Sequence, residues 1–218
     1  MGNLSCRLDL QIMKSKILFP SSPKGTTVNF YKDEKIPSKV AFEDGVIKFT
    51  DNKSFVTCYS PLRMIELGIF GHGYFGIKDV DEAEFRKLLN LVPNFADQID
   101  EEIRGKILLH PQDFSLNRYG INAGLDHTAW TENKWIIPDD PYGWFNWYVQ
   151  FYYGRRHKDD FRQINRFRAF VKRHWGMLNG FCQNANVPIE QAEYRYQKTC
   201  QGLLQWGWDY LINPAEKF

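Results

Sequence analysis

The chain has 218 residues and a formal net charge of +2; 43% of the residues are hydrophobic, 16% aromatic and 25% charged. This composition excludes a disordered chain and indicates a globular protein with an aromatic core. No apolar run reaches the roughly 18–20 residues of a membrane-spanning helix, and the start carries no signal-peptide-like apolar region. The four Cys residues form no CxxC pair, so we expect reduced thiols in an intracellular protein, cytoplasmic or nuclear, with no membrane partner.

Residues 1–37 are predicted to be an irregular entry segment, because they are polar and contain scattered Ser, Pro and Lys. Gly2 is a weak candidate for myristoylation, since the pattern has Ser or Thr at position six and this chain has Cys6. Met13 is an alternative start that would remove Gly2. We expect residues 38–218 to form a single domain.

Alternating apolar and polar residues around "EDG" and "TDNKS" predict three short antiparallel strands with hairpin turns. The expected strands are Val40–Phe42, Val46–Phe49 and Phe55–Tyr59. Ser60 followed by Pro61 predicts the start of a short helix that Gly68 ends. A glycine-rich loop, "GIFGHGYFG", follows, and it lacks both the Walker A ending and the GxGxxG setting of a nucleotide-binding loop.

The middle of the chain predicts helices and then loops. Apolar spacing indicates a helix over residues 79–92, capped by Asp79 or Asp81, and a second helix that begins at Pro93 and continues to about Ile107. Residues 105–140 contain several Pro and Gly residues and predict long structured loops with one or two short turns.

The C-terminal part predicts three helices. Asp140 with Pro141 indicates the cap of an aromatic helix that ends at Gly154. Asp159 or Asp160 would cap a second helix to about Leu178, and Pro188 would open the last. The apolar stripe of the second helix is expected at positions 161, 164, 167, 171, 175 and 178. The predicted fold class is α+β, with a small antiparallel sheet near the N-terminus and a mainly helical C-terminal core.

The stretch "GWFNWYVQFYY", residues 143–153, is apolar nearly all round. Such a helix is typical of the centre of a core, because most of its surface must be covered. A base-stacking platform is the alternative, but platforms usually expose only one or two rings. We therefore predict that these aromatic residues are core residues.

Residues 155–174 carry eight Lys or Arg side chains against two Asp. This local excess of positive charge predicts an anionic partner, nucleic acid or another phosphate-containing ligand. The alternative is that the arginines pair with carboxylates of the chain itself, Asp159 and Asp160 included. The candidate anion-binding residues are Arg155, Arg156, Arg162, Arg166 and Lys172.

Catalytic groups are harder to identify, because no HExxH, GxSxG or spaced metal-ligand pattern occurs. The loop-rich segment supplies isolated candidates for acid–base chemistry: His110, Asp126, His127 and Asp139. A metal site from the two His residues and a carboxylate is an open alternative, but no metal is predicted. The sequence assigns no cofactor.

Three segments, "YSPLRMIELGIFGHGYF", "DPYGWFNWYVQFYYGRRHKDDFRQINRFRAF" and "GLLQWGWDYL", resemble a family of uncharacterised proteins in bacteriophages, bacteria, fungi and plants. Its members share a Gly-Trp-Phe-x-Trp-Tyr stretch, a Gly-Arg-Arg turn, a pair of Asp, an Arg-Gln-Ile step and a Leu-Leu-Gln-Trp segment. The resemblance covers about residues 59–212, and Phe167 stands where the family has Trp. It implies one intact intracellular domain, and no catalytic residue carries over because the family has no assigned activity.

Three functions are therefore open. The leading hypothesis is binding of nucleic acid or another polyanion through the basic surface of residues 155–173. The second is an enzyme that acts on a nucleobase or nucleotide, with Arg155 and Arg156 as the anion anchor. The third is a structural or interaction protein, in which the arginines pair with acidic segments such as residues 97–102. The partners of Arg155, Arg156 and Arg162 distinguish these hypotheses.

Overall fold

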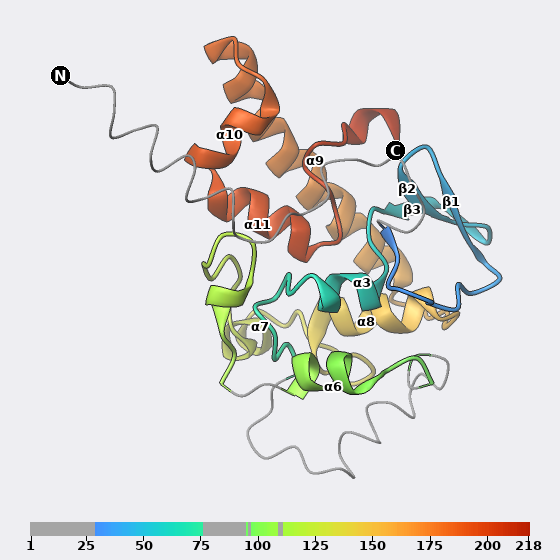
Figure 1. Ribbon diagram of the computed structural model, residues 1–218. Helices are drawn as coiled ribbons and strands as arrows, with labels where there is room; N and C mark the ends of the chain where they lie inside the picture. The colour runs from blue at the N-terminus through green and yellow to red at the C-terminus, as the bar shows by residue number, and fades with distance from the viewer. Residues whose placement is uncertain (1–28, 76–94, 96, 109–110) are drawn as a thin grey trace.

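A computed structural model describes residues 29–75, 95, 97–108 and 111–218 (Figure 1). A three-stranded antiparallel sheet lies at one side of a helical body, so the predicted α+β class is confirmed. Within the described residues no helix is both long enough and apolar enough to cross a membrane. The helix expected over residues 79–92 lies outside the described part of the chain.

The sheet has the order β1-β2-β3. Its strands are β1 (Val40–Glu43), β2 (Val46–Phe49) and β3 (Asn52–Thr57). Asp44 and Gly45 join the first two strands, and both have positive φ angles, 52° and 81°, as the type I′ turn of a two-residue hairpin requires. The three predicted strands are confirmed, although β3 begins and ends earlier than expected.

Two short helices follow, and side chains cap both. In α3 (Pro61–Glu66) the Ser60 Oγ accepts a hydrogen bond from the backbone N–H of Arg63 at 3.2 Å, as predicted. In α6 (Glu101–Leu108) Asp100 Oδ1 accepts from the N–H of Ile103 at 2.8 Å. The single helix expected from Pro93 to about Ile107 is therefore interrupted: Phe95 is helical, a turn follows at residues 97 and 98, and α6 begins at Glu101.

The expected loop segment contains the 3-10 helix η1 (Phe114–Leu116) and the helix α7 (His127–Glu132). After it come α8 (Gly143–Tyr152) and α9 (Asp160–Ala185), joined by a short turn.

Asp140 was expected to cap α8, and this prediction is wrong. Tyr142 occupies the cap position without a side-chain hydrogen bond, and the buried Asp140 carboxylate accepts hydrogen bonds from Gln150 and Arg155 instead.

Helix α9 extends seven residues beyond the expected end at Leu178. Cys182 is buried in the added turns, and Asn186 ends the helix in the left-handed conformation with φ 52°. The last expected helix is divided at Tyr196 into α10 (Ile189–Arg195) and α11 (Gln197–Gln205). The 3-10 helix η2 (Pro214–Glu216) closes the chain against α9.

All ten residues of α8 are buried, which confirms the prediction of an aromatic core helix. The sheet packs on it through rings: Phe49 and Phe55 lie 5.0 and 5.2 Å from Phe151, centroid to centroid. Helix α9 adds Phe167, which lies 5.1 Å from Phe55. In Figure 1, α8 runs toward the sheet, and α9 turns back from that side and rises to α10.

Four of the six expected apolar positions of α9 are fully buried, but Phe161 is 77% exposed, so its assignment to the core was wrong.

Three Cys residues are buried free thiols, as expected, and Cys6 lies outside the described residues. The entry segment reaches the domain before its expected end at residue 37. Asn29 donates to the carbonyl oxygen of Cys58 at 2.6 Å, and Phe30 is buried.

Candidate functional site: the arginine-rich turn and helix α9

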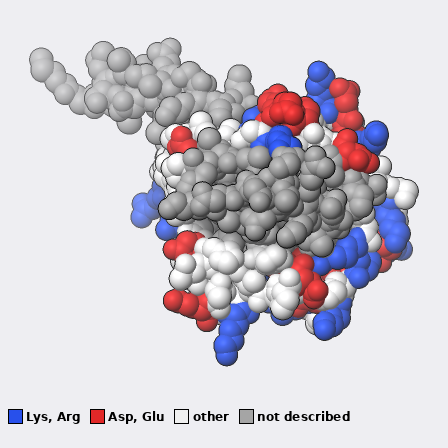
Figure 2. Space-filling model, turned by 90° about the horizontal axis from the view of Figure 1, so that it is seen from below, with Lys and Arg blue, Asp and Glu red and all other residues white. Residues whose placement is uncertain are grey.

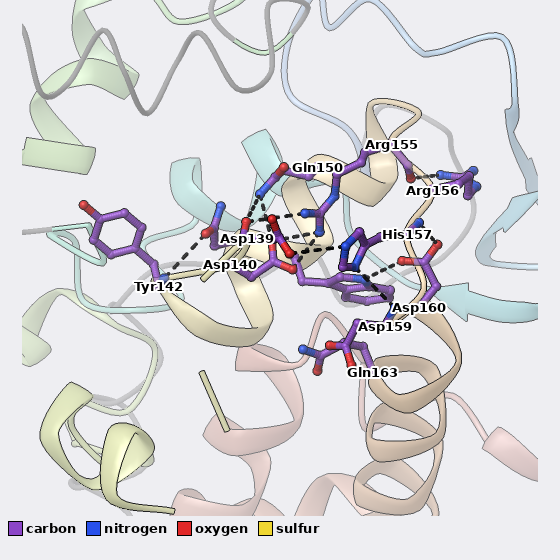
Figure 3. A network of polar contacts seen from close by, with 12 residues as sticks. Asp139, Asp140, Tyr142, Gln150, Arg155, Arg156, His157, Asp159, Asp160 and Gln163 are labelled. Carbon is purple, nitrogen blue, oxygen red and sulfur yellow. Dashed lines mark hydrogen bonds and ion pairs between the residues drawn. The ribbon is translucent and has the colours of Figure 1, made fainter. Parts of the chain in front are cut away.

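The turn between α8 and α9 is built around Asp160, which is 9% exposed (Figure 3). Its Oδ1 accepts from the indole N–H of Trp147 at 2.8 Å, and its Oδ2 accepts from the backbone N–H of His157 at 2.8 Å. Gly154, with φ +108°, supplies the conformation that lets the chain leave α8. Asp160 therefore ties the start of α9 to the aromatic core and fixes where the neighbouring arginines point.

Arg155 points back along α8 to the loop that precedes this helix. One guanidinium nitrogen, Nη2, lies 2.8 Å from Oδ1 and 2.7 Å from Oδ2 of Asp140. Gln150 donates to the same carboxylate at 2.8 Å. Burial raises the pKa of Asp140, whose carboxylate is 1% exposed, and the hydrogen bond from Arg155 opposes that rise. The charge of Arg155 is thus already compensated inside the protein.

Arg156 points the other way, toward the sheet. Its Nη2 lies 2.7 Å from Oδ1 of Asp51, in the turn between β2 and β3. Its Nη1 donates to the carbonyl oxygens of Phe151 and Arg155 at 2.6 and 2.7 Å, and its guanidinium lies 3.8 Å from the centre of the Phe151 ring. The hydrogen bond from Arg156, assisted by Lys39, lowers the pKa of Asp51 to about 2.

Arg162 forms a two-pronged ion pair within the first turn of α9. Its Nε and Nη2 each lie 2.6 Å from an oxygen of Asp159. This hydrogen bonding raises the pKa of the guanidinium above its usual value. Arg155, Arg156 and Arg162 therefore do not converge on an open pocket. Their partners are Asp140, Asp51 and Asp159, and not the acidic segment of residues 97–102.

Arg166 differs from these three, because no carboxylate of the described residues lies within ion-pair distance of it. It donates to Oε1 of Gln163 at 3.0 Å, and its guanidinium lies 5.4 Å from the Trp135 ring centre and 5.8 Å from that of Trp206. Burial lowers the pKa of Arg166, and the nearby charge of Arg162 adds to the effect. Arg166 is a partly buried cation held by two indole rings.

The remaining cations of α9 face solvent. Lys172 and Arg173 are exposed, and Arg168 is half-buried. Arg168 and Lys172 each lie 5.5 Å from the centre of the Phe218 ring. None of the three forms an ion pair with a described carboxylate. Of the predicted anion-binding residues, Lys172 and the partly buried Arg166 thus keep an uncompensated charge, and Arg168 and Arg173 join them.

The solvent face of α9 has no acidic side chain, since residues 161–185 contain no Asp or Glu. Helical spacing places small or short side chains along the middle of this face, at Asn165, Ala169 and Gly176. A different face of the molecule is shown in Figure 2, where Lys and Arg side chains are interspersed with Asp and Glu around the grey residues. The acid-free α9 face is therefore the part of the arginine-rich segment that can accept an anionic partner.

The predicted catalytic residues are dispersed. Asp126 caps α7 by accepting from the N–H of Ala129 at 2.8 Å, and His127 Nε2 lies 2.9 Å from the carbonyl oxygen of Pro141. Neither contacts Asp139 or the arginines through a hydrogen bond or an ion pair. His110 lies outside the described residues. The structure thus gives Asp126 a helix-capping contact and His127 a backbone contact.

Asp139 has a partner that sequence reasoning missed. Its Oδ2 lies 3.3 Å from Nε2 of His157, and the Nδ1 of that ring accepts from the N–H of Asp159 at 3.3 Å. This contact places the imidazole proton on Nε2, facing the carboxylate. The position of His157 directly after the two arginines was the signal available in the sequence. Asp139 is 57% exposed, so this pair lies at the surface.

Two hollows in the described surface lie away from this pair. A shallow groove of about 390 Å³ follows the connection from α9 to α10, between Asn179 and Ile189. A smaller hollow beside His72 is lined by apolar side chains and Lys106. Within the described residues, no three His, Cys, Asp or Glu side chains are grouped so that they could hold a metal ion.

Comparison of the chain with protein-family models, curated proteins and solved structures finds no match.

Proposed function

We propose that this chain binds nucleic acid or a similar polyanion through the solvent face of α9, with Arg168, Lys172 and Arg173 at the phosphates. The observation that carries the proposal is the difference between two groups of cations in one segment. Arg155, Arg156 and Arg162 have carboxylate partners at 2.6–2.8 Å, whereas the cations farther along α9 have none among the described residues. An uncompensated cation keeps its full attraction for phosphate.

The shape of the α9 face supports the same proposal. Short side chains at Asn165, Ala169 and Gly176 share the middle stripe of the face with Lys172, and Arg168 and Arg173 lie on either side of that stripe. A Cβ atom added at Gly176 would meet no atom within 4 Å, so the helix backbone itself is accessible there. A phosphate backbone can therefore approach the helix closely while Lys172 and Arg173 reach its oxygens.

Titration of a labelled oligonucleotide at increasing salt tests the proposal. Three phosphate contacts predict that affinity falls by about 20- to 40-fold between roughly 50 and 200 mM salt, because each contact releases counterions. The double variant Lys172→Ala/Arg173→Ala should bind more weakly and show a shallower salt dependence. Lys32→Ala/Lys53→Ala is the matched control, since it removes the same charge from exposed positions outside α9. Absence of binding at low salt would refute the proposal.

A structural or interaction role is the second candidate, and a specific observation favours it: three of the five predicted anion-binding arginines and lysines are compensated internally. The same titration separates the two functions. A purely structural protein would show no salt-dependent oligonucleotide binding, and the α9 double variant would then behave as the parent chain does. The buried free thiols Cys58, Cys182 and Cys200 support an intracellular setting under either proposal.

A further inference from the structure

We propose that the nucleic acid bound on α9 is single-stranded, and that an unstacked base lies on the ring of Trp135 at the edge of the α9 face. This inference rests on the proposed function and names the class of polyanion. Of the seven Trp side chains, Trp135 is the one that is more than a third exposed, at 38%. It lies beside Arg166, one of the four cations of α9 that have no carboxylate partner among the described residues.

The local backbone holds the Trp135 ring in place. Helix α7 ends in a Schellman motif, in which the N–H of Trp135 donates to the carbonyl oxygen of Trp130 and the N–H of Lys134 donates to that of Thr131, both at 3.0 Å. Lys134 takes the left-handed position with φ 57°. The exposed Lys134 directly precedes Trp135 in the chain, and the guanidinium of Arg166 lies 5.4 Å from the ring centre.

This arrangement has the parts of a base-stacking site. An exposed indole offers a face to any base, and adjacent cations offer contacts to the phosphate of the same nucleotide. Arg166 is already ordered by Gln163 and by the two indoles, so little side-chain freedom remains to be lost when an anion binds.

A second exposed ring lies on the other edge of the same face. Phe161 is 77% exposed, and its distance of five positions from Arg166 places the two side chains on opposite edges of the α9 face. Exposed rings on both sides of a basic, acid-free helix face suit a single strand, whose bases are free to splay onto them. In a duplex the bases are stacked on one another, so no base would be available to stack on these rings.

The test compares three probes of equal length: oligothymidine, an abasic phosphodiester oligomer and a duplex. The proposal expects oligothymidine to bind more tightly than the abasic oligomer, which retains the charges and lacks the bases. Trp135→Ala should weaken oligothymidine binding by about five- to a hundredfold and leave abasic binding unchanged. Trp135→Phe should restore most of the loss, because it keeps a ring. An oligouridine probe then distinguishes RNA from DNA.

The outcomes separate this inference from the function on which it rests. Salt-dependent binding of equal strength to oligothymidine and the abasic oligomer would overturn base stacking and leave polyanion binding intact. Equal weakening of both probes by Trp135→Ala would also overturn it, because the loss would then reflect charge or folding. No binding of any probe at low salt would remove both proposals. Thermal unfolding of Trp135→Ala and Trp135→Phe shows whether each variant is folded in the assay.

Discussion

Arg155 and Asp140 join the two ends of the buried helix α8: a single guanidinium nitrogen lies 2.7 and 2.8 Å from the two carboxylate oxygens. The Asp140 carboxylate is 1% exposed, whereas Arg155 is 22% exposed. The pair therefore joins a partly exposed arginine to a buried carboxylate. Removing the acid leaves the Arg155 cation and the amide of Gln150 with only the longer hydrogen bonds to the carbonyl oxygen of Asp139, at 3.4 and 3.2 Å, which costs more than the pair contributes when it is intact.

Asp140→Ala should accordingly lower the free energy of unfolding by about 2–3 kcal/mol, near the lower end for a broken buried pair because Arg155 retains some contact with water. Denaturant unfolding followed by tryptophan fluorescence measures the change. Asp139→Asn is the matched control: its side chain is 57% exposed, and we expect a change within about 0.5 kcal/mol. Equal losses of unfolding free energy in both variants would contradict the inference that the buried Asp140 carboxylate contributes more to stability than the exposed Asp139 carboxylate.

The Asp51–Arg156 pair predicts acid-sensitive stability. The hydrogen bond from Arg156 and the contact with Lys39 lower the pKa of Asp51 from 3.8 to about 2 in the folded protein. The stabilisation is therefore complete above about pH 4 and is lost as the pH falls toward about 2. Solvent screening limits it to about 1 kcal/mol or less. Asp51→Asn should flatten the fall in unfolding free energy over this window; an unchanged acid profile would argue against the pair.

Phe161 and Phe167 lie six positions apart on α9, and we expect their substitution by Ala to have very different effects on stability. Phe167 is fully buried, so Phe167→Ala should cost about 3–5 kcal/mol through lost burial and a cavity. Phe161 is 77% exposed, so Phe161→Ala should change stability by less than about 0.5 kcal/mol. Thermal and denaturant unfolding of both variants measure this contrast. A large loss for Phe161→Ala would mean that the ring is covered in solution.

Three described glycines, Gly176, Gly180 and Gly71, are expected to respond differently to substitution by Ala. Gly176→Ala and Gly180→Ala should each stabilise α9 by about 0.5–1 kcal/mol, because both positions are helical and an added Cβ would meet no atom within 4 Å. Gly71→Ala should destabilise the protein. Gly71 has φ +72°, and its Cβ would lie 2.6 Å from the backbone of Asp113 and Phe114. Melting temperatures of the three variants provide the measurement.

Local patterns predicted most of the fold. The type I′ turn at Asp44–Gly45, the Ser60 cap and the aromatic α8 each depend on residues close together in the chain, so spacing and turn chemistry were sufficient. The exposure of Phe161 was missed because the helical period places it at the margin of the apolar stripe, and at that margin the Phe161 ring faces solvent although Ile164 is buried. The break at Tyr196 has no Gly or Pro to mark it.

The candidate site was less predictable, because two of its three arginine ion pairs join residues that lie 15 and 105 positions apart. An Asp followed by Pro has the same pattern whether it caps a helix or receives an arginine, so the role of Asp140 depended on where Arg155 points. The partner of Arg156 lies 105 positions earlier, at Asp51. Composition showed the surplus of positive charge in residues 155–174, but only tertiary structure divides it into compensated and free cations.

The three ion pairs of the arginine-rich turn also differ in how much chain each one encloses. Arg162 and Asp159 are three residues apart, Arg155 and Asp140 fifteen, and Arg156 and Asp51 one hundred and five. Closing a longer loop costs more entropy, so the two nearer pairs can form while α8 and α9 first meet, and the pair with the sheet completes only when the hairpin has docked. We therefore expect Arg156 to be the last of the three guanidiniums to become ordered during folding.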